Sequence, residues 1–398
     1  MTMDGSVAEL LDEIAALSRH FGSDPEFTRG GGGNSSGKAD GILYIKPSGV
    51  PLAGLTPSSL MPLAMEPLLA VVDRTDVVTL PGSEEVLRIG MGARLDPADR
   101  RRPSVECMFH ALLPERIVIH THPTTVNALT CARDGRRLAA EIFGDDVLWV
   151  PYVDPGLPLA RRIAAERRAH EERTGKPAPR AMLLQNHGLI VTGERTAEIM
   201  EHSAAVVAAV RERVERSAPA AALPAAARAA MAPLVRAVAA AIGDRFGREG
   251  RPKVVAADTS PAALELGATA AGRSFVRGGP LTPDQIVYAG SWPLLVEAPP
   301  SDADLFADTL RARLAEHVAS THEPPSIIVV EGVGLFAVAD TADLAATARD
   351  VYLDAIRIAD GAARLGGIRP LAPEERRFIE EWEAEAYRRG VASGGPEG

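Results

Sequence analysis

A stretch dominated by alanine and proline near the middle of the chain most constrains how this sequence can fold. Residues 217–233, within RSAPAAALPAAARAAMAP, hold almost no bulky side chain that a core could bury. The chain has 398 residues, more than one hydrophobic core usually supports. We therefore expect two domains, residues 1–216 and residues 234–398, joined by a linker over residues 217–233.

The first half alternates helix-like and strand-like segments, which predicts a mixed α/β domain. Apolar residues at helical spacing and breaker residues at the ends define most of these segments. Helices are expected over residues 7–21, 104–113 (with Ser104 as the N-cap), 124–132, 158–175 and 196–214. Strands are expected within residues 42–49, 117–120 and 145–152, and as a pair within residues 181–193 that meet at a tight turn.

Composition excludes several classes of protein. The formal net charge of −10 argues against non-specific nucleic-acid binding, which needs clustered Lys and Arg. No uncharged apolar run reaches the roughly 18 residues of a membrane-spanning helix, so no membrane association is expected. The N-terminal segment is acidic where a secretion signal would be basic, and only two cysteines are present. These features predict a cytoplasmic protein.

Two histidines end a short β-branched run in the segment IVIHTHP. Ile117–Ile119 reads as a buried strand, and His120 and His122 are two residues apart at its end. Alternate side chains of a strand point to the same face, so the two imidazoles lie on one side with Cα atoms about 6.7 Å apart. Two imidazoles at this spacing can bind one metal ion if a third ligand is near.

The segment QNHGLIV supplies a candidate third ligand, His187, at the predicted tight turn. Three neutral imidazoles leave one position open on a tetrahedral zinc ion, which is typical of catalytic sites. The alternative is that each histidine is an ordinary core or surface residue. Glu106 is a candidate proton acceptor on the same face of its predicted helix as His110. Its alternative is an acid that favours the helix dipole.

Two loops are candidates for binding an anion. Gly30–Gly33 is followed by Asn34 and Ser35, and the segment KPSG places Ser48 and Gly49 in a turn. Backbone N–H groups and small hydroxyls in such loops can surround a phosphate. The spacing matches neither a P-loop nor a dinucleotide-binding fingerprint, and a flexible linker is the alternative for each loop.

Taken in order, these motifs resemble those of the class II aldolase/adducin family. The order is a Gly-Asn-Ser loop, a Ser-Gly turn, a Pro-Ser-x-Glu helix start, a His-x-His strand end and an Asn-His-Gly turn. The likeness is greatest to the aldolase part of the bifunctional rhamnulose-1-phosphate aldolase/short-chain dehydrogenase proteins. It implies an αβα fold with a central, mostly antiparallel sheet, usually assembled as a homotetramer.

The resemblance also implies an activity and roles for the motif residues. The expected reaction is the zinc-dependent, reversible cleavage of a ketose 1-phosphate, similar to rhamnulose 1-phosphate, to dihydroxyacetone phosphate and an aldehyde through an enediolate. Epimerases and dehydratases of the family use the same three histidines, and a non-catalytic adducin-like scaffold is a remote alternative. The implied zinc ligands are His120, His122 and His187, with Glu106 as acid/base. The implied phosphate-binding residues are Asn34, Ser35, Ser48, Gly49 and Ser104.

This sequence departs from the family pattern in two places. Val105 stands where many family aldolases have a second serine before the glutamate, so one phosphate contact is missing. Some relatives also take an acid from a neighbouring subunit to protonate the leaving aldehyde. Glu141 is the expected acid here, with Asp145 and Tyr152 as weaker candidates.

The second half contains segments similar to the first. LPERIVIHTHP resembles LTPDQIVYAGSWP, and LLQNHGLIVTGERTAEI resembles VVEGVGLFAVADTADLA. These matches suggest a smaller second αβ domain that is a degenerate copy of the first, with Val333 at the position of His187 and no metal site. The alternative is two unrelated domains that share strand–turn–helix order.

Overall fold

The computed structural model describes residues 5–74, 85–217, 238–242, 253–297, 299 and 302–382. The chain forms two compact units: unit 1 comprises Met1–Ser217 together with Gly361–Gly398, and unit 2 comprises Ala218–Asp360. Beyond Ser217, the expected linker lies outside the described residues. The described residues 361–382 were expected in the second domain, but their contacts assign them to unit 1.

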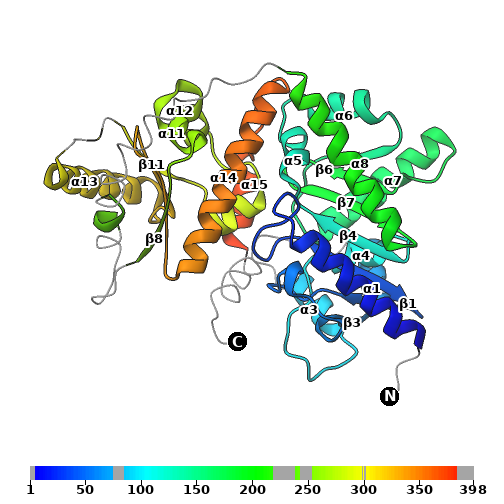
Figure 1. Ribbon diagram of the computed structural model, residues 1–398. Coiled ribbons are helices and arrows are strands. Elements are labelled where there is room, and N and C mark those ends of the chain that lie inside the picture. Colours follow the sequence, from blue (N-terminus) through cyan, green and yellow to red (C-terminus); the bar gives the residue numbers. More distant parts are fainter. Residues whose placement is uncertain are drawn as a thin grey trace. The chain divides into compact units, whose positions relative to one another are not determined.

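Unit 1 is built on a seven-stranded sheet that is mostly antiparallel, as the resemblance implied (Figure 1). The strand order is β3-β2-β1-β4-β7-β6-β5, and only β5 and β6 pair in parallel. The strands are β1 (Asn34–Ala39), β2 (Ile42–Ile45), β3 (Met61–Ala64), β4 (Ile117–Thr121), β5 (Val147–Val150), β6 (Ala181–Leu184) and β7 (Gly188–Gly193).

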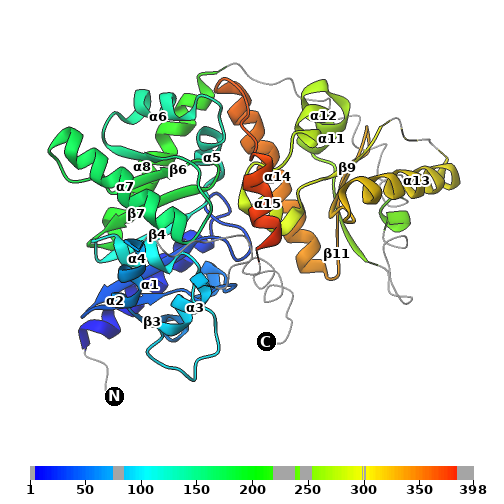
Figure 2. The same ribbon diagram turned by 180° about the vertical axis from the view of Figure 1, so that it is seen from behind.

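Helices cover both faces of this sheet, so unit 1 has three layers in the order helices, sheet, helices (Figures 1 and 2). Side chains of β4 alternate between two cores: Ile117 and Ile119 join one, and Val118 joins the other. The first core includes α1 (Gly5–Gly22), α5 (Thr124–Thr130), α6 (Gly135–Phe143) and α8 (Thr196–Glu215). The second includes α2 (Met65–Val72), α4 (Cys107–Leu112) and α7 (Leu157–Thr174), with α3 (Glu85–Gly92) beside it. Strands buried on both faces explain the apolar runs in the sequence.

Two local expectations need correction. The Gly-rich loop ends at Gly33, because Asn34–Ser36 are the buried start of β1 and pair antiparallel with β4. The helix expected over residues 104–113 spans only Cys107–Leu112. Its start is delayed because the Ser104 hydroxyl accepts a hydrogen bond from the Glu106 N–H at 3.2 Å, in a turn that precedes the helix.

Unit 2 contains a four-stranded sheet in the order β8-β11-β10-β9. Its strands are β8 (Val254–Asp258), β9 (Leu294–Val296), β10 (Ile327–Val330) and β11 (Gly334–Ala339). Its helices include α11 (Pro261–Ala268), α12 (Ala270–Arg277), a π-helical turn η3 (Gln285–Ala289) and α13 (Ala303–Thr321). Helix α14 (Ala342–Arg364) carries the chain back to unit 1, where α15 (Pro373–Glu381) lies.

The sheet of unit 2 has the strand pairing of one half of the unit 1 sheet. The order β4-β7-β6-β5 matches β8-β11-β10-β9, with two antiparallel pairs followed by one parallel pair in each. Apart from η3, which unit 2 adds before β9, the order of described elements along the chain is also shared: a strand, two helices, a strand, a helix, a strand pair and a long helix. This agreement of pairing and order supports an internal duplication.

The structure corrects the residue correspondence between the two copies. The segment LTPDQIVYAGSWP forms η3 rather than a strand, so it is not the counterpart of β4. The strand register makes β8 the counterpart of β4 instead. Thr121 of β4 pairs with Leu189 of β7, and Asp258 of β8 pairs with Leu335 of β11 in the same way. The positions of His120, His122 and His187 are therefore occupied by Ala257, Thr259 and Val333.

Candidate metal centre

His120 lies in the middle of the sheet, on β4 between β1 and β7. Its side chain is fully buried, and its Nδ1 lies 3.0 Å from the Leu189 carbonyl oxygen. A carbonyl can only accept, so Nδ1 carries the proton and donates it to Leu189. The neutral ring then presents the lone pair of Nε2, which is the form that binds a metal ion.

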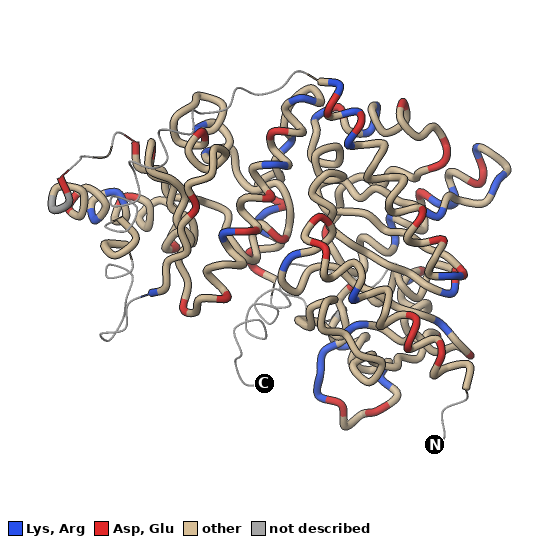
Figure 3. The backbone as a smooth tube through the Cα atoms, viewed as in Figure 1, with Lys and Arg blue, Asp and Glu red and all other residues tan. Residues whose placement is uncertain are grey.

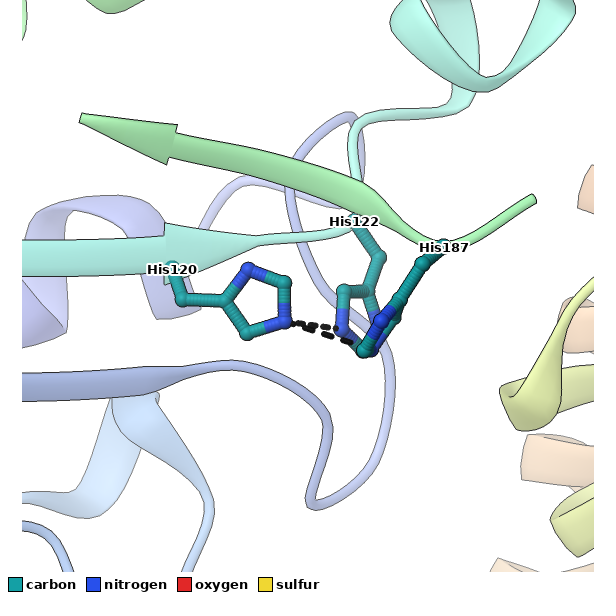
Figure 4. Close-up of side chains that lie close together, drawn as sticks. All are labelled: His120, His122 and His187. Carbon is teal, nitrogen blue, oxygen red and sulfur yellow. Dashed lines mark hydrogen bonds between the residues drawn. The ribbon is translucent and has the colours of Figure 1, made fainter. Parts of the chain in front are cut away.

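His122 and His187 direct their rings to the same place (Figure 4). The Nε2 atom of His120 lies 3.0 Å from Nε2 of His122 and 3.4 Å from Nε2 of His187. His122 follows β4 and is held by its N–H, which donates to the Phe27 carbonyl at 2.8 Å. The three ligand nitrogen atoms all lie within 4.8 Å of one another.

The donor set fits a tetrahedral metal ion. Zinc–nitrogen bonds of 2.0–2.1 Å separate two ligands by about 3.3 Å at the tetrahedral angle. The separations of 3.0 and 3.4 Å from His120 bracket that value. These imidazoles could therefore hold one divalent ion and leave a position for another ligand.

Two glycines allow the backbone to approach these rings closely. A Cβ atom on Gly188 would lie 2.3 Å from the Thr121 carbonyl oxygen and 2.9 Å from Cδ2 of His122. Gly33 has a φ of +75°, and its Cβ would lie 2.7 Å from the His120 carbonyl oxygen. Both positions exclude a side chain, which explains why glycines precede Asn34 and follow His187.

Glu106 places its carboxylate beside the imidazoles. Its Oε1 lies 3.6 Å from Nε2 of His187 and 3.8 Å from Nε2 of His120. Its Oε2 accepts a hydrogen bond of 2.5 Å from the side-chain amide of Asn34. The carboxylate is buried, so it can exchange protons with a bound ligand in a low-dielectric site.

His110 does not share this site with Glu106, although the expected helix put the two on one face. Its Nδ1 forms a 2.7 Å hydrogen bond with the Ser36 hydroxyl, and its ring stacks on Phe109. Burial, with a smaller effect of His120, holds the pKa of His110 well below its usual value. His110 is therefore a neutral core residue.

The residues that were expected to bind the phosphate make several different contacts within unit 1. Asn34 binds Glu106, and Ser35 points to the opposite face of β1, where its buried hydroxyl lies 2.7 Å from that of Ser18. The Ser48 N–H donates to the Arg102 carbonyl, and Gly49 is buried with a φ of +81°. The ammonium group of the buried Lys46 donates to the carbonyls of Gly31 and Val50, which links the two candidate anion loops.

Three candidate acids were expected outside the histidine cluster. Glu141 is exposed on α6 and accepts a hydrogen bond from Arg137. Asp145 forms an exposed ion pair of 2.7 Å with Arg173. Burial raises the pKa of the Tyr152 phenol. Within the described part of the chain, none of these three side chains forms a hydrogen bond or ion pair with the histidines.

Asn127 is a site residue that the sequence reasoning missed. Its side-chain amide donates to the His187 carbonyl at 3.2 Å, and its side-chain oxygen accepts from Thr130 at 2.8 Å. It is buried on α5, the helix that follows β4 and His122. The available signal was a polar amide on the apolar face of an expected helix, which requires a specific partner.

Basic and acidic residues are mixed along the described parts of the chain. Lys and Arg are interspersed with Asp and Glu along the described chain of both units (Figure 3). Among the described residues, no helix combines the length and apolar character needed to cross a membrane.

Both halves of the chain match models of known protein families. Residues 12–214 match the family model described as the class II aldolase and adducin N-terminal domain. Residues 225–388 match the model described as the second domain of class II aldolase. The first match covers half of the chain and contains all three histidines and Glu106.

Individual relatives are more distant. A curated protein of Bacillus subtilis strain 168, described as the uncharacterized oxidoreductase YuxG, is 24% identical over 421 residues; the alignment covers 95% of this chain and 58% of that protein. The N-terminal class II aldolase domain of a Thermoplasma acidophilum protein is 25% identical, with a TM-score of 0.44, covering 54% of this chain and 96% of that one. An L-fuculose-1-phosphate aldolase from Thermus thermophilus is 17% identical, with a TM-score of 0.34, covering 52% of this chain and 95% of that one.

Proposed function

The chain belongs to the class II aldolase and adducin family, and from this premise we propose that it is a zinc-dependent aldolase. The proposed substrate is a ketose 1-phosphate similar to rhamnulose 1-phosphate, cleaved reversibly to dihydroxyacetone phosphate and an aldehyde. The observation that carries the proposal is the convergence of three imidazoles with one buried carboxylate, Glu106. Adducin-like scaffold members of the family would need no such arrangement.

His120, His122 and His187 would hold the metal ion. When bound, the ion would supply Lewis acidity for the negative charge that develops on the sugar oxygens as the carbon–carbon bond breaks. The bond from His120 Nδ1 to Leu189 keeps that ligand neutral and fixes its ring. In the synthetic direction, Oε1 of Glu106 takes the proton from the carbon next to the carbonyl, and in cleavage it returns that proton.

Asn34 controls how Glu106 performs this step. Its amide holds Oε2, so the carboxylate cannot rotate without breaking a buried hydrogen bond. Asn34 therefore acts on the base rather than on the phosphate.

The phosphate is assigned to the loops around Ser48, Gly49 and Ser104. Lys46 supports this assignment because its buried ammonium group donates to the carbonyl of Val50, directly after the Ser48–Gly49 turn, and to that of Gly31 in the Gly-rich loop. Ser35 would contribute only through its backbone, since its hydroxyl points to α1. Val105, buried and apolar, adds no hydroxyl, so we expect weaker phosphate binding than a two-serine motif provides.

The proposal extends to a homotetramer in which Glu141 protonates the leaving aldehyde in a neighbouring subunit. Exposure of Glu141 on α6 is compatible with this role. Light scattering would give the molecular mass in solution. A mass of one chain, or full cleavage activity in Glu141→Gln, would refute this part of the proposal.

The test of the main proposal compares metal content and products. Wild type should bind one zinc ion per chain and release a free aldehyde from deoxyketose 1-phosphates. His187→Ala should lose the metal, while His202→Ala, which removes an exposed histidine of α8, should keep it. Glu106→Gln should keep the metal and lose activity by about 10²- to 10⁴-fold.

Other outcomes would redirect the assignment. An isomerised sugar phosphate without free aldehyde would identify an epimerase, and loss of water would identify a dehydratase. Wild-type protein without metal would contradict the metal centre and leave a scaffold role. Full activity in Glu106→Gln would contradict the role of that carboxylate.

A further inference from the structure

The turn that carries His187 has an unusual residue immediately before it. Asn186 is completely buried and has a φ of +54°, in the left-handed region that favours glycine. The duplicated unit shows the alternative, because the equivalent residue there is Gly332, with a φ of +69°. The copy without histidines at the three candidate ligand positions thus uses glycine here, and the copy with them uses asparagine. This difference suggests that the side-chain amide of Asn186 has a task besides forming the turn.

Arg369 is the partner of that amide. Its Nη1 donates to Oδ1 of Asn186 at 2.6 Å, and the side-chain nitrogen of Asn186 donates to the Arg369 carbonyl at 2.8 Å. The pair therefore closes a ring of two hydrogen bonds between segments 183 residues apart in sequence. Two bonds fix both the position and the orientation of the Asn186 side chain.

Arg369 is itself held on two further sides. Its Nη2 donates to Glu375 at 2.8 Å, and its backbone N–H donates to the Cys131 carbonyl at 2.8 Å. The other oxygen of Glu375 accepts from the N–H of Ala372 at 2.7 Å. The guanidinium is thus a fixed point in unit 1 rather than a mobile surface group.

We propose that Arg369 is a positioning residue that holds His187 in the geometry for metal binding, acting through Asn186. This inference rests on the proposed metal centre. It has a consequence for domain organisation, because Arg369 follows unit 2 in sequence and lies within the second family match, residues 225–388. The first match ends at residue 214, so that segment alone lacks the residue that orients the third ligand.

The experiment uses the full chain and four variants. Arg369→Met removes the donors but keeps length, and Asn186→Gly removes the amide but suits the left-handed turn. The third is the double variant, and the control is Arg377→Ala, an exposed arginine of the same helix as Glu375. Zinc affinity is measured by chelator competition, and the unfolding midpoint is measured on metal-free protein.

Arg369→Met and Asn186→Gly should each weaken zinc binding by about tenfold, the lower end for loss of an outer-shell partner. The double variant should bind zinc no more weakly than the weaker-binding single variant, because both substitutions remove the same Asn186–Arg369 interaction. Wild-type affinity in Arg369→Met, or additive losses in the double variant, would overturn the inference. A lowered unfolding midpoint with unchanged affinity would also overturn it, because that result indicates a structural role only.

A metal-independent measurement separates this inference from the proposed function. In zinc-free protein, the ¹⁵N resonances of the His187 imidazole, assigned with His187→Ala, should shift in Arg369→Met and stay in place in Arg377→Ala. If wild type binds no zinc but the His187 resonances still shift in Arg369→Met, the metal centre would be refuted and the positioning role retained. Zinc binding with no shift and no loss of affinity would refute the positioning role alone.

Discussion

Replacing Gly188 with alanine should damage the candidate metal centre more than any other single-methyl addition near it. The new methyl carbon would lie 2.3 Å from the Thr121 carbonyl oxygen, where real contacts are essentially never under 3.0 Å. The two strands must therefore separate by at least about 0.7 Å, several times the roughly 0.2 Å tolerance of a metal–ligand distance. His187, the adjacent residue, must move away from His120 and His122.

The expected result has two separable parts. Overpacking should lower the free energy of unfolding by about 1–3 kcal/mol. Loss of one of three ligands should weaken zinc binding by about 100-fold or more, because a two-histidine site remains. Chelator competition gives the affinity, and urea unfolding of metal-free protein gives the stability.

Gly334→Ala is the matched control in unit 2. Its methyl carbon would lie 2.5 Å from the Asp258 carbonyl oxygen, at the equivalent strand crossing. This variant should lose stability, and its φ of +147° adds backbone strain, but zinc affinity should stay at the wild-type value. If Gly188→Ala binds zinc as tightly as Gly334→Ala does, the close approach of β7 to β4 does not set the ligand geometry and the reasoning fails.

Two further predictions concern unit 1 outside the ligands. Burial, with Glu375 nearby, raises the pKa of Asp154 from 3.8 to about 6, so ionisation of this group lowers the stability of the folded state as the pH rises from about 4 to 6, and by the full amount above pH 6. Because Asp154 is half exposed, Asp154→Asn should raise the free energy of unfolding by only about 1 kcal/mol at pH 7.5. In thermal unfolding, this gain in stability should vanish below about pH 4, where Asp154 is protonated in both the folded and the unfolded state. A gain that persists at pH 4 would contradict this prediction. Ser35→Ala should lower the free energy of unfolding by about 1 kcal/mol, because it removes the hydrogen bond to Ser18, and KM should stay within twofold of the wild-type value. A large rise in KM would show that the Ser35 hydroxyl binds the phosphate.

The elements were predictable where local pattern determines them. The buried run before His120, the tight turn at His187 and the helix closed by Gly175 follow from strand composition, turn residues and a left-handed C-cap. The end of the Gly-rich loop was not predictable in this way. Asn34–Ser36 have weak strand propensity, and they form β1 because pairing with β4 and burial override that preference.

Long-range contacts explain what the sequence could not give about the site. The histidines could be proposed from spacing and turn chemistry, but the partners that orient them could not. Asn127 lies 60 residues from the carbonyl it binds, and Arg369 lies 183 residues from Asn186. The sequence assigned Asn34 and Ser35 to one role, whereas strand alternation sends them to opposite faces of β1.

The duplicated sheet bears directly on why the histidines are present. Unit 2 forms the same strand order, the same turn and the same close approach of a glycine to the neighbouring strand with Ala257, Thr259 and Val333 at the ligand positions. The fold therefore does not need imidazoles there. In unit 1 three of them are buried or half-buried with converging nitrogen atoms, a costly arrangement for groups that serve only packing. A chemical role explains that cost, and metal binding is the role that fits the separations between the nitrogen atoms.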